Sequence, residues 1–402
     1  MNRSLACAAF LSVAFVAYAS LYPFELRALA PGAFAQLLAT ASHPIDSWIN
    51  LLSNILFYMP FGFLAAAALQ RAEIKPISTV VGITIAGAAL SVVMELTQMH
   101  VAGRLSTFAD IYPNTAGAGL GACLGVAARL WAVRPRGDIA SIAPVPALLL
   151  AVFLAYRLFP YVPSLDLHAY WRAVQPLIVH PRLELLDMLR YAVMWFAVAA
   201  LLQRLSLPWR VPGLALLLMG AVWVAKILIL HNQLTASEAV GGTGGLIAWA
   251  ILGRADDQRV AAITALVLGV WIIASRLTPF VFTAHSSTFG WIPFAALMQG
   301  SMSINTIALL EKSFVYGTML WALGRAGLRL PVGAASLAAM LVLLAGLQTH
   351  IPGRSAEITD AAIALAMAVI IALLTSTTHM QTAERQQPTV RYKRRPRMRD
   401  VA

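Results

Sequence analysis

Residues 98–110 read QMHVAGRLSTFAD and lie between two strongly apolar segments. A second stretch, residues 348–360, reads QTHIPGRSAEITD and begins 250 residues after the first. Both follow the pattern Gln-x-His-x-x-Gly-Arg-x5-Asp, and five matching residues at fixed spacing are improbable by chance. The pattern therefore predicts a chain with internal repeats, in which each repeat presents a polar loop.

The composition of the chain is too apolar for a protein that exposes its whole surface to water. Among its 402 residues 60% are hydrophobic and 11% charged, and the mean hydropathy is +0.76. A soluble domain carries about 25% charged residues. Many apolar runs reach the roughly 20 residues that a membrane-spanning helix needs. We therefore predict an all-α fold, that of a polytopic integral membrane protein.

Three apolar runs end in similar sequences that contain proline. These endings are LYPF at 21–24, RLFPY at 157–161 and RLTPF at 276–280. Proline ends a helix because it lacks a backbone donor and disfavours helix in the preceding residue. Residues 1–22 also resemble a signal peptide. Because they match the start of the later repeats, we expect them to remain as the first helix.

The apolar runs predict about twelve transmembrane helices in three four-helix repeats. The helices are expected near residues 5–22, 48–69, 78–97, 112–132, 142–159, 184–203, 211–231, 236–252, 259–278, 304–323, 331–349 and 357–377. The units are expected at residues 1–135, 136–255 and 256–379, followed by a basic disordered cytoplasmic tail at 380–402.

The placement of positive charge predicts the orientation in the membrane. With both termini in the cytoplasm, the inner loops and the tail hold 19 of the 29 Lys and Arg residues. Short basic loops on the cytoplasmic side are what the positive-inside rule requires. The tail carries a net charge of +5, which favours attraction to anionic lipid headgroups over nucleic acid. The polar loops then lie on the outer side.

The first unit carries polar residues at helical spacing inside its apolar runs. Asn50 and Asn54 are four residues apart and share a helix face, and Glu95 and Gln98 are one turn apart. Together with the two polar loops they give the ligand-binding candidates Asn50, Asn54, Glu95, Gln98, His100, Arg104, Asp110, Asn114, Gln348, His350, Arg354 and Asp360. The glycines of the fourth helix, four apart, most simply allow close helix packing; they are Gly117, Gly121 and Gly125.

The order and spacing of these residues resemble the VanZ-like family. Its pattern is Asn-x3-Asn-x5-Pro-x-Gly, then Glu-x-x-Gln, then Arg-x5-Asp-x3-Asn-Thr-x-Gly. The matching positions are Asn50, Asn54, Pro60, Gly62, Glu95, Gln98, Arg104, Asp110, Asn114, Thr115 and Gly117. The resemblance covers residues 5–132 and implies a protein of the bacterial cell envelope, in the inner (cytoplasmic) membrane. The family is named after teicoplanin resistance, so the resemblance also implies a link to glycopeptide antibiotic resistance, without a mechanism.

The other two units keep only part of this pattern. The third has Ala345 and Ala364 where the first has Glu95 and Asn114. The second is degenerate. Its matches by alignment are Lys226 at the position of Gln98, Asn232 and Glu238 at those of Arg104 and Asp110, and Arg190 near that of Asn54, where the third unit has Lys312.

Two interpretations of the polar loop remain open. Arg104 can pair with Asp110, and its guanidinium suits bidentate binding of carboxylate or phosphate. Polar residues at membrane depth usually face protein or water, which favours a binding site at the outer boundary. The alternative is hydrogen bonding between helices that fixes the four-helix unit. His100 and His350 each lack a second nearby His or Cys, so we predict no metal and no cofactor.

The preferred function is binding of an anionic or sugar-linked envelope lipid or precursor through the outward polar loops. The expected partners are membrane lipids and lipid-linked cell-wall or polysaccharide precursors, without nucleic acid. One alternative is a transporter of an envelope-related solute, which twelve helices and internal repeats also fit. The other is an intramembrane enzyme with Glu95 or Asp110 as general base. It ranks last because no complete catalytic constellation appears.

Overall fold

The computed structural model is helical throughout the part of the chain that it describes. The described residues are 3–29, 31–40, 48–69, 75–104, 106–133, 143–205, 210–299 and 302–386. Within them three isolated β-bridges occur and no strand. The all-helical fold class is therefore confirmed.

A helix occupies each of the twelve ranges expected from the apolar runs. These helices are α1 (Arg3–Leu21), α3 (Trp48–Ala68), α4 (Pro76–Gln98), α5 (Ile111–Val133), α6 (Pro144–Leu158), α8 (Leu185–Leu202), α9 (Val211–Leu228), α10 (Ala236–Leu252), α11 (Asp257–Leu277), α13 (Met302–Arg325), α14 (Leu330–Gln348) and α15 (Thr359–Gln386). Shorter helices lie in the described connections: α2 (Ala33–Ala39), α7 (Leu167–Ile178), α12 (Ala295–Gln299) and the 3-10 turn η2 (Phe108–Asp110).

The C-terminal helix is longer than expected. It continues to Gln386, so residues 380–386, expected in a disordered tail, are helical. The rest of that tail, 387–402, lies outside the described residues.

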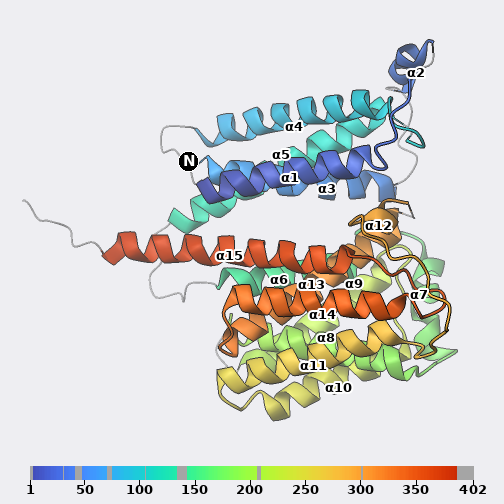
Figure 1. Ribbon diagram of the computed structural model, residues 1–402. Helices are drawn as coiled ribbons and strands as arrows, with labels where there is room; N and C mark the ends of the chain where they lie inside the picture. The colour runs from blue at the N-terminus through green and yellow to red at the C-terminus, as the bar shows by residue number, and fades with distance from the viewer. Residues whose placement is uncertain are drawn as a thin grey trace, which may run out of the picture.

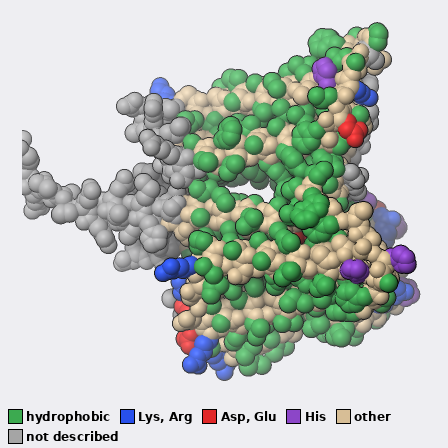
Figure 2. Space-filling model, in the orientation of Figure 1, with side chains coloured by type: hydrophobic (Ala, Val, Ile, Leu, Met, Phe, Trp, Pro, Cys, Tyr) green, Lys and Arg blue, Asp and Glu red, His purple; other side chains and the backbone are tan. Residues whose placement is uncertain are grey.

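Among the residues that the structure describes, six helices are long and apolar enough to cross a membrane. They are Asn50–Ala68, Pro76–Gln98, Leu185–Leu202, Val211–Leu228, Asp257–Leu277 and Leu330–Gln348. The shorter apolar helices are Leu5–Leu21, Pro144–Leu158, Ala236–Leu252 and Thr359–Thr375. Figure 2 shows hydrophobic side chains along the sides of the helices, with charged and His side chains near their ends. These features are those of a multi-pass membrane protein.

The helices form two groups that lie side by side (Figure 1). We call α1–α5 the N-terminal group and α6–α15 the C-terminal group. Near the ends of α1 and α12 the groups touch: the Tyr18 hydroxyl donates to the Pro293 carbonyl at 2.7 Å, and the rings of Phe15 and Phe294 are 5.3 Å apart. One large buried cluster, which includes Phe153, Trp195 and Phe314, runs through the C-terminal group.

Two helices of the N-terminal group pack almost backbone to backbone. A Cβ added to Gly62 of α3 would lie 2.0 Å from the Ala118 carbonyl oxygen of α5. A Cβ on Gly121 of α5 would lie 2.1 Å from the Met59 oxygen of α3, and Gly117 and Gly125 meet α3 in the same way. Only glycine allows this approach, so the packing role expected for the α5 glycines is confirmed.

Both ends of the described chain lie at the same end of the bundle, and the polar loops lie at the other (Figure 1). We call the second end the loop end. There, α1, α6 and α11 are each followed by a cis peptide bond, at Tyr22–Pro23, Phe159–Pro160 and Thr278–Pro279. The residue after each proline has a positive φ, between 62° and 65°. Three helices separated in the sequence therefore end in the same local conformation.

Candidate functional site

The first polar loop, residues 99–110, holds the end of α1. Arg104 donates from Nε to the Tyr22 carbonyl and from Nη2 to the Ala19 carbonyl, both at 2.8 Å. Gln98 donates to the Ser20 carbonyl at 2.9 Å. The last carbonyls of a helix have no hydrogen-bond donors within the helix. The side chains of Arg104 and Gln98 donate to them instead. The partial burial of Arg104 lowers the pKa of its guanidinium below the ordinary value, because burial disfavours the charged form.

The second polar loop makes the same contacts with the end of α11. Gln348 donates to the Arg276 carbonyl at 2.9 Å. Arg354 donates to the Thr278 carbonyl at 2.9 Å and to the Ser275 carbonyl at 3.3 Å. The Gln and Arg of the duplicated pattern thus serve one structural purpose in both places.

The region expected as the second unit replaces the arginine by a shorter side chain. Asn232 donates from Nδ2 to the Phe159 carbonyl at 3.1 Å, at the end of α6. This carbonyl precedes a cis proline, as the Tyr22 carbonyl does. Asn232 therefore occupies the structural position that the alignment with Arg104 predicts.

The two histidines of the pattern lie at the surface. Both are exposed. The His100 Nδ1 is 3.2 Å from the Leu96 carbonyl, and the His350 Nδ1 is 3.1 Å from the Thr283 carbonyl. Across the described residues, no group of three His, Cys, Asp or Glu side chains is arranged to hold a metal ion.

A polar cluster joins α3, α4 and α5 at the loop end of the N-terminal group. Asn54 donates from Nδ2 to the Asp110 carboxylate at 3.0 Å. Glu95 is 4% exposed and accepts the backbone N–H of Thr107 at 2.9 Å. Asn114, also buried, donates to the Ser91 hydroxyl at 2.9 Å; we call Asn54, Glu95, Asp110 and Asn114 the acid–amide cluster.

Two of the expected site residues lie outside this cluster. Asn50 is exposed at the start of α3. Arg104 does not form the expected ion pair with Asp110, because its guanidinium turns toward the carbonyls of α1. The structure therefore separates the residues that fasten the loop from those that form the acid–amide cluster.

The C-terminal group builds ion pairs at the corresponding places. Glu238, at the start of α10, is fully buried and contacts both Arg157 of α6 and Lys226 of α9. Asp360, at the start of α15, contacts Arg276 of α11 and is 2.9 Å from the Lys312 ammonium of α13. Here the acid at the start of α10 and the acid at the start of α15 are each matched by two cations.

Arg157 and Arg276 were not among the candidates predicted from the sequence. Each lies three residues before the proline that follows its helix, where the first region has Ser20. That substitution of Arg for Ser was the available signal. A further pair, Arg190 with Glu311, links α8 to α13 by two hydrogen bonds at 2.9 and 2.6 Å.

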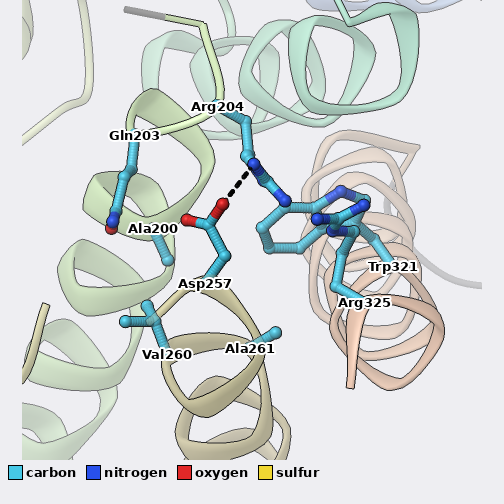
Figure 3. Close-up of a pocket in the computed structure, with 8 residues that line it drawn as sticks. All are labelled: Ala200, Gln203, Arg204, Asp257, Val260, Ala261, Trp321 and Arg325. Atoms are coloured by element: carbon cyan, nitrogen blue, oxygen red, sulfur yellow. Dashed lines mark hydrogen bonds and ion pairs between the residues drawn. The ribbon is translucent and has the colours of Figure 1, made fainter. Parts of the chain in front are cut away.

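A small cavity lies at the opposite end of the C-terminal group, beside Arg204 and Asp257. Figure 3 shows Arg204 reaching the carboxylate of Asp257, which it contacts at 2.6 Å. The adjoining cavity, lined also by Trp321 and Arg325, has a volume of about 10 Å³. That is room for about one water molecule.

Residues 5–129 match the VanZ/LLP1 family model. This VanZ-like segment contains α3, α4 and most of α1 and α5, and with them the whole acid–amide cluster. The resemblance seen in the motifs is thereby confirmed for this part of the chain. Comparison with curated proteins and with solved structures gave no match.

Proposed function

We propose that this membrane protein binds a sugar-linked or anionic envelope lipid, or a lipid-linked precursor, at the loop end of its VanZ-like segment. The acid–amide cluster carries the proposal. Its carboxylates accept hydrogen bonds and its amides both donate and accept, which suits the hydroxyl groups of a sugar. Polar side chains within membrane-spanning helices are costly, and a cluster of them is by default a candidate functional site.

The contacts divide the candidate residues by role. Asn54 and Asp110 are only partly buried, and they are the members of the cluster that we assign to the ligand. The buried Glu95 and Asn114 hold the helices around them. Arg104 and Gln98 position the loop, because their donors serve the carbonyls of α1 and Arg104 is partly buried, whereas Arg354 of the second loop is exposed. This division favours the sugar part of a ligand over its phosphate in the N-terminal group.

We further propose the architecture of three four-helix units and twelve spans, in the inner membrane, with both termini cytoplasmic. The matched contacts of Arg104, Asn232 and Arg354 support three units, because each side chain reaches the carbonyl before a cis proline. Both ends of the described chain lie at the same end of the bundle, which supports an even number of spans. A link to glycopeptide resistance stays a prediction from the family resemblance.

Native mass spectrometry of co-purifying lipids tests the binding function. Asp110→Asn and Asn54→Ala each remove one proposed contact. We expect retention of the bound lipid to fall about tenfold in each, at unchanged abundance in the membrane. Thr97→Val is the matched control, because the Thr97 hydroxyl donates to the Val93 carbonyl of its own helix at the same end. An identical lipid profile in all four proteins would refute the proposal.

A further inference from the structure

A second polar cavity lies at the loop end of the C-terminal group, outside the VanZ-like segment. Its volume is about 400 Å³, which lies within the range of small-molecule sites. It is formed by the start of α8, the end of α11, the first half of α13 and the second polar loop. The charged side chains that line it are Asp187, Arg190, Arg276, Glu311, Lys312 and Arg354.

Positive charge exceeds negative charge in this cavity. Arg190 is matched by Glu311 through two hydrogen bonds. Arg276 and Lys312 share one carboxylate, that of Asp360 behind the wall. With Asp187 and Asp360 counted, four basic side chains face three acidic ones. The cavity as built therefore has a net charge of +1.

The exposed cation of the cavity is Arg354. Its guanidinium donates to the carbonyls of Thr278 and Ser275, and it forms no ion pair with any residue in the described ranges. Arg276 is held in place by the Tyr316 hydroxyl, which accepts from its Nη2 at 2.6 Å. The guanidinium of Arg354, held by neutral carbonyl oxygens, keeps its charge for another anion.

The cavity also lies beside apolar surface. The end of α11 and the start of α8 are ends of candidate membrane spans. Leu186 lines the cavity and is exposed, as are its neighbours Leu185 and Leu189. A charged chamber next to exposed apolar side chains suits a molecule with a charged head and an apolar tail.

We propose that this cavity binds a phosphoryl group, carried by a lipid headgroup or as free phosphate. Arginine and lysine together are the side chains that proteins use for phosphoryl oxygens. Arg354 and Lys312 contact the ligand, and Arg190 and Arg276, each paired with a carboxylate, line the wall beside them. The site goes beyond the proposed sugar-binding function of the N-terminal group and does not depend on it.

The test measures retention of added lipid by the purified full-length protein, using native mass spectrometry. Phosphatidylglycerol is compared with diacylglycerol of the same acyl chains, which lacks the phosphoryl group. We expect the wild type to retain phosphatidylglycerol at least tenfold better. Inorganic phosphate, added as competitor, identifies the source: displacement of the lipid points to free phosphate as a ligand, and persistence points to the intact headgroup.

Lys312→Gln removes one cation while Arg276 still pairs with Asp360, and we expect retention of phosphatidylglycerol to fall about tenfold. Lys312→Arg should restore it. The control is Arg204→Gln, which removes a partly exposed cation beside the cavity of about 10 Å³ at the opposite end and should change nothing. Arg354→Gln provides an independent second variant, with the same expected loss, where Lys312→Gln does not fold.

Equal retention of the two lipids by the wild type would overturn the inference. So would unchanged retention in folded Lys312→Gln and Arg354→Gln. Asp110→Asn separates this site from the proposed function, since it should keep phosphatidylglycerol while losing the sugar-linked lipid. If Asp110→Asn loses the sugar-linked lipid and Lys312→Gln retains phosphatidylglycerol as the wild type does, the phosphoryl site is refuted and the N-terminal proposal stands.

Discussion

The loop ends of the N-terminal and C-terminal groups share a backbone design and differ in charge. In both, a helix ends at a cis proline and a side chain from a later loop binds its last carbonyls. The acid that opens the next helix contacts the neutral amide of Asn54 in the N-terminal group. In the C-terminal group Glu238 and Asp360 each contact two cations.

This difference separates a structural use of the acid from a binding use. A buried carboxylate between two cations is held firmly, because removal of any one charge leaves the others without compensation. A carboxylate that contacts an amide can exchange that hydrogen bond for one from a ligand at low cost. We therefore expect substitutions of the acids to affect stability in the C-terminal group and ligand binding in the N-terminal group.

The largest expected effect is that of Glu238→Gln. It leaves Arg157 and Lys226 buried without a carboxylate, and we expect a loss of about 3–5 kcal/mol of stability. Thermal unfolding in detergent and abundance in the membrane measure it. Asp110→Asn is the counterpart in the N-terminal group and should cost about 1 kcal/mol. Equal losses for the two variants would remove the distinction between the groups.

Arg104→Ala compares the side-chain hydrogen bonds that hold the end of α1 with the one that holds the end of α6. Arg104 donates two hydrogen bonds to carbonyls at the end of α1, whereas Asn232 donates one at the end of α6. We expect a cost of about 3 kcal/mol for Arg104→Ala and about 1 kcal/mol for Asn232→Ala, since bonds from charged donors are stronger. Thermal unfolding compares them, and proteolysis within 99–110 should accelerate only in Arg104→Ala. A larger loss in Asn232→Ala would contradict this.

Gly121→Ala tests the close packing of α3 and α5. Its Cβ would lie 2.1 Å from the Met59 carbonyl oxygen, so the helices must separate. We expect a cost of about 2 kcal/mol from overpacking, measured by thermal unfolding. Gly82→Ala in α4 is the control, because its Cβ would meet nothing within 4 Å. It should stabilise by about 0.5–1 kcal/mol, and a loss equal to that of Gly121→Ala would exclude steric contact as the cause.

The helices could be predicted from the sequence because apolar length alone encodes them. A helix lies in each of the twelve expected ranges, from the run near 5–22 to the run near 357–377. The end of α15 was missed, since residues 380–386 contain the polar sequence MQTAERQ, which does not extend the apolar pattern. A helix that continues past its apolar segment cannot be recognised from the length of the apolar run.

The candidate site could be predicted only in part. Asn54 and Asp110 were both among the ligand-binding candidates, and the structure brings them into contact. The partners of Arg104 could not be foreseen, because carbonyl groups at a helix end are present in every sequence. The pairing of Arg276 with Asp360 had a signal, since arginine replaces Ser20 at the same distance from proline. That signal is visible only where the two helix ends are aligned residue by residue.

The smallest expected effect concerns the residue before each fastening side chain. Gly103 and Gly353 have φ of 75° and 73°, and the corresponding residue before Asn232 is His231, with φ of 63°. A residue with a side chain is strained in this conformation by about 1–2 kcal/mol. Glycine avoids the strain but loses more conformational entropy on folding, which offsets part of the gain. We therefore expect His231→Gly to stabilise by about 0.5–1 kcal/mol in thermal unfolding, and Gly103→His to destabilise by a similar amount. Destabilisation by His231→Gly would show that the imidazole makes contacts worth more than the strain, and that the three loops are not equivalent in backbone energy.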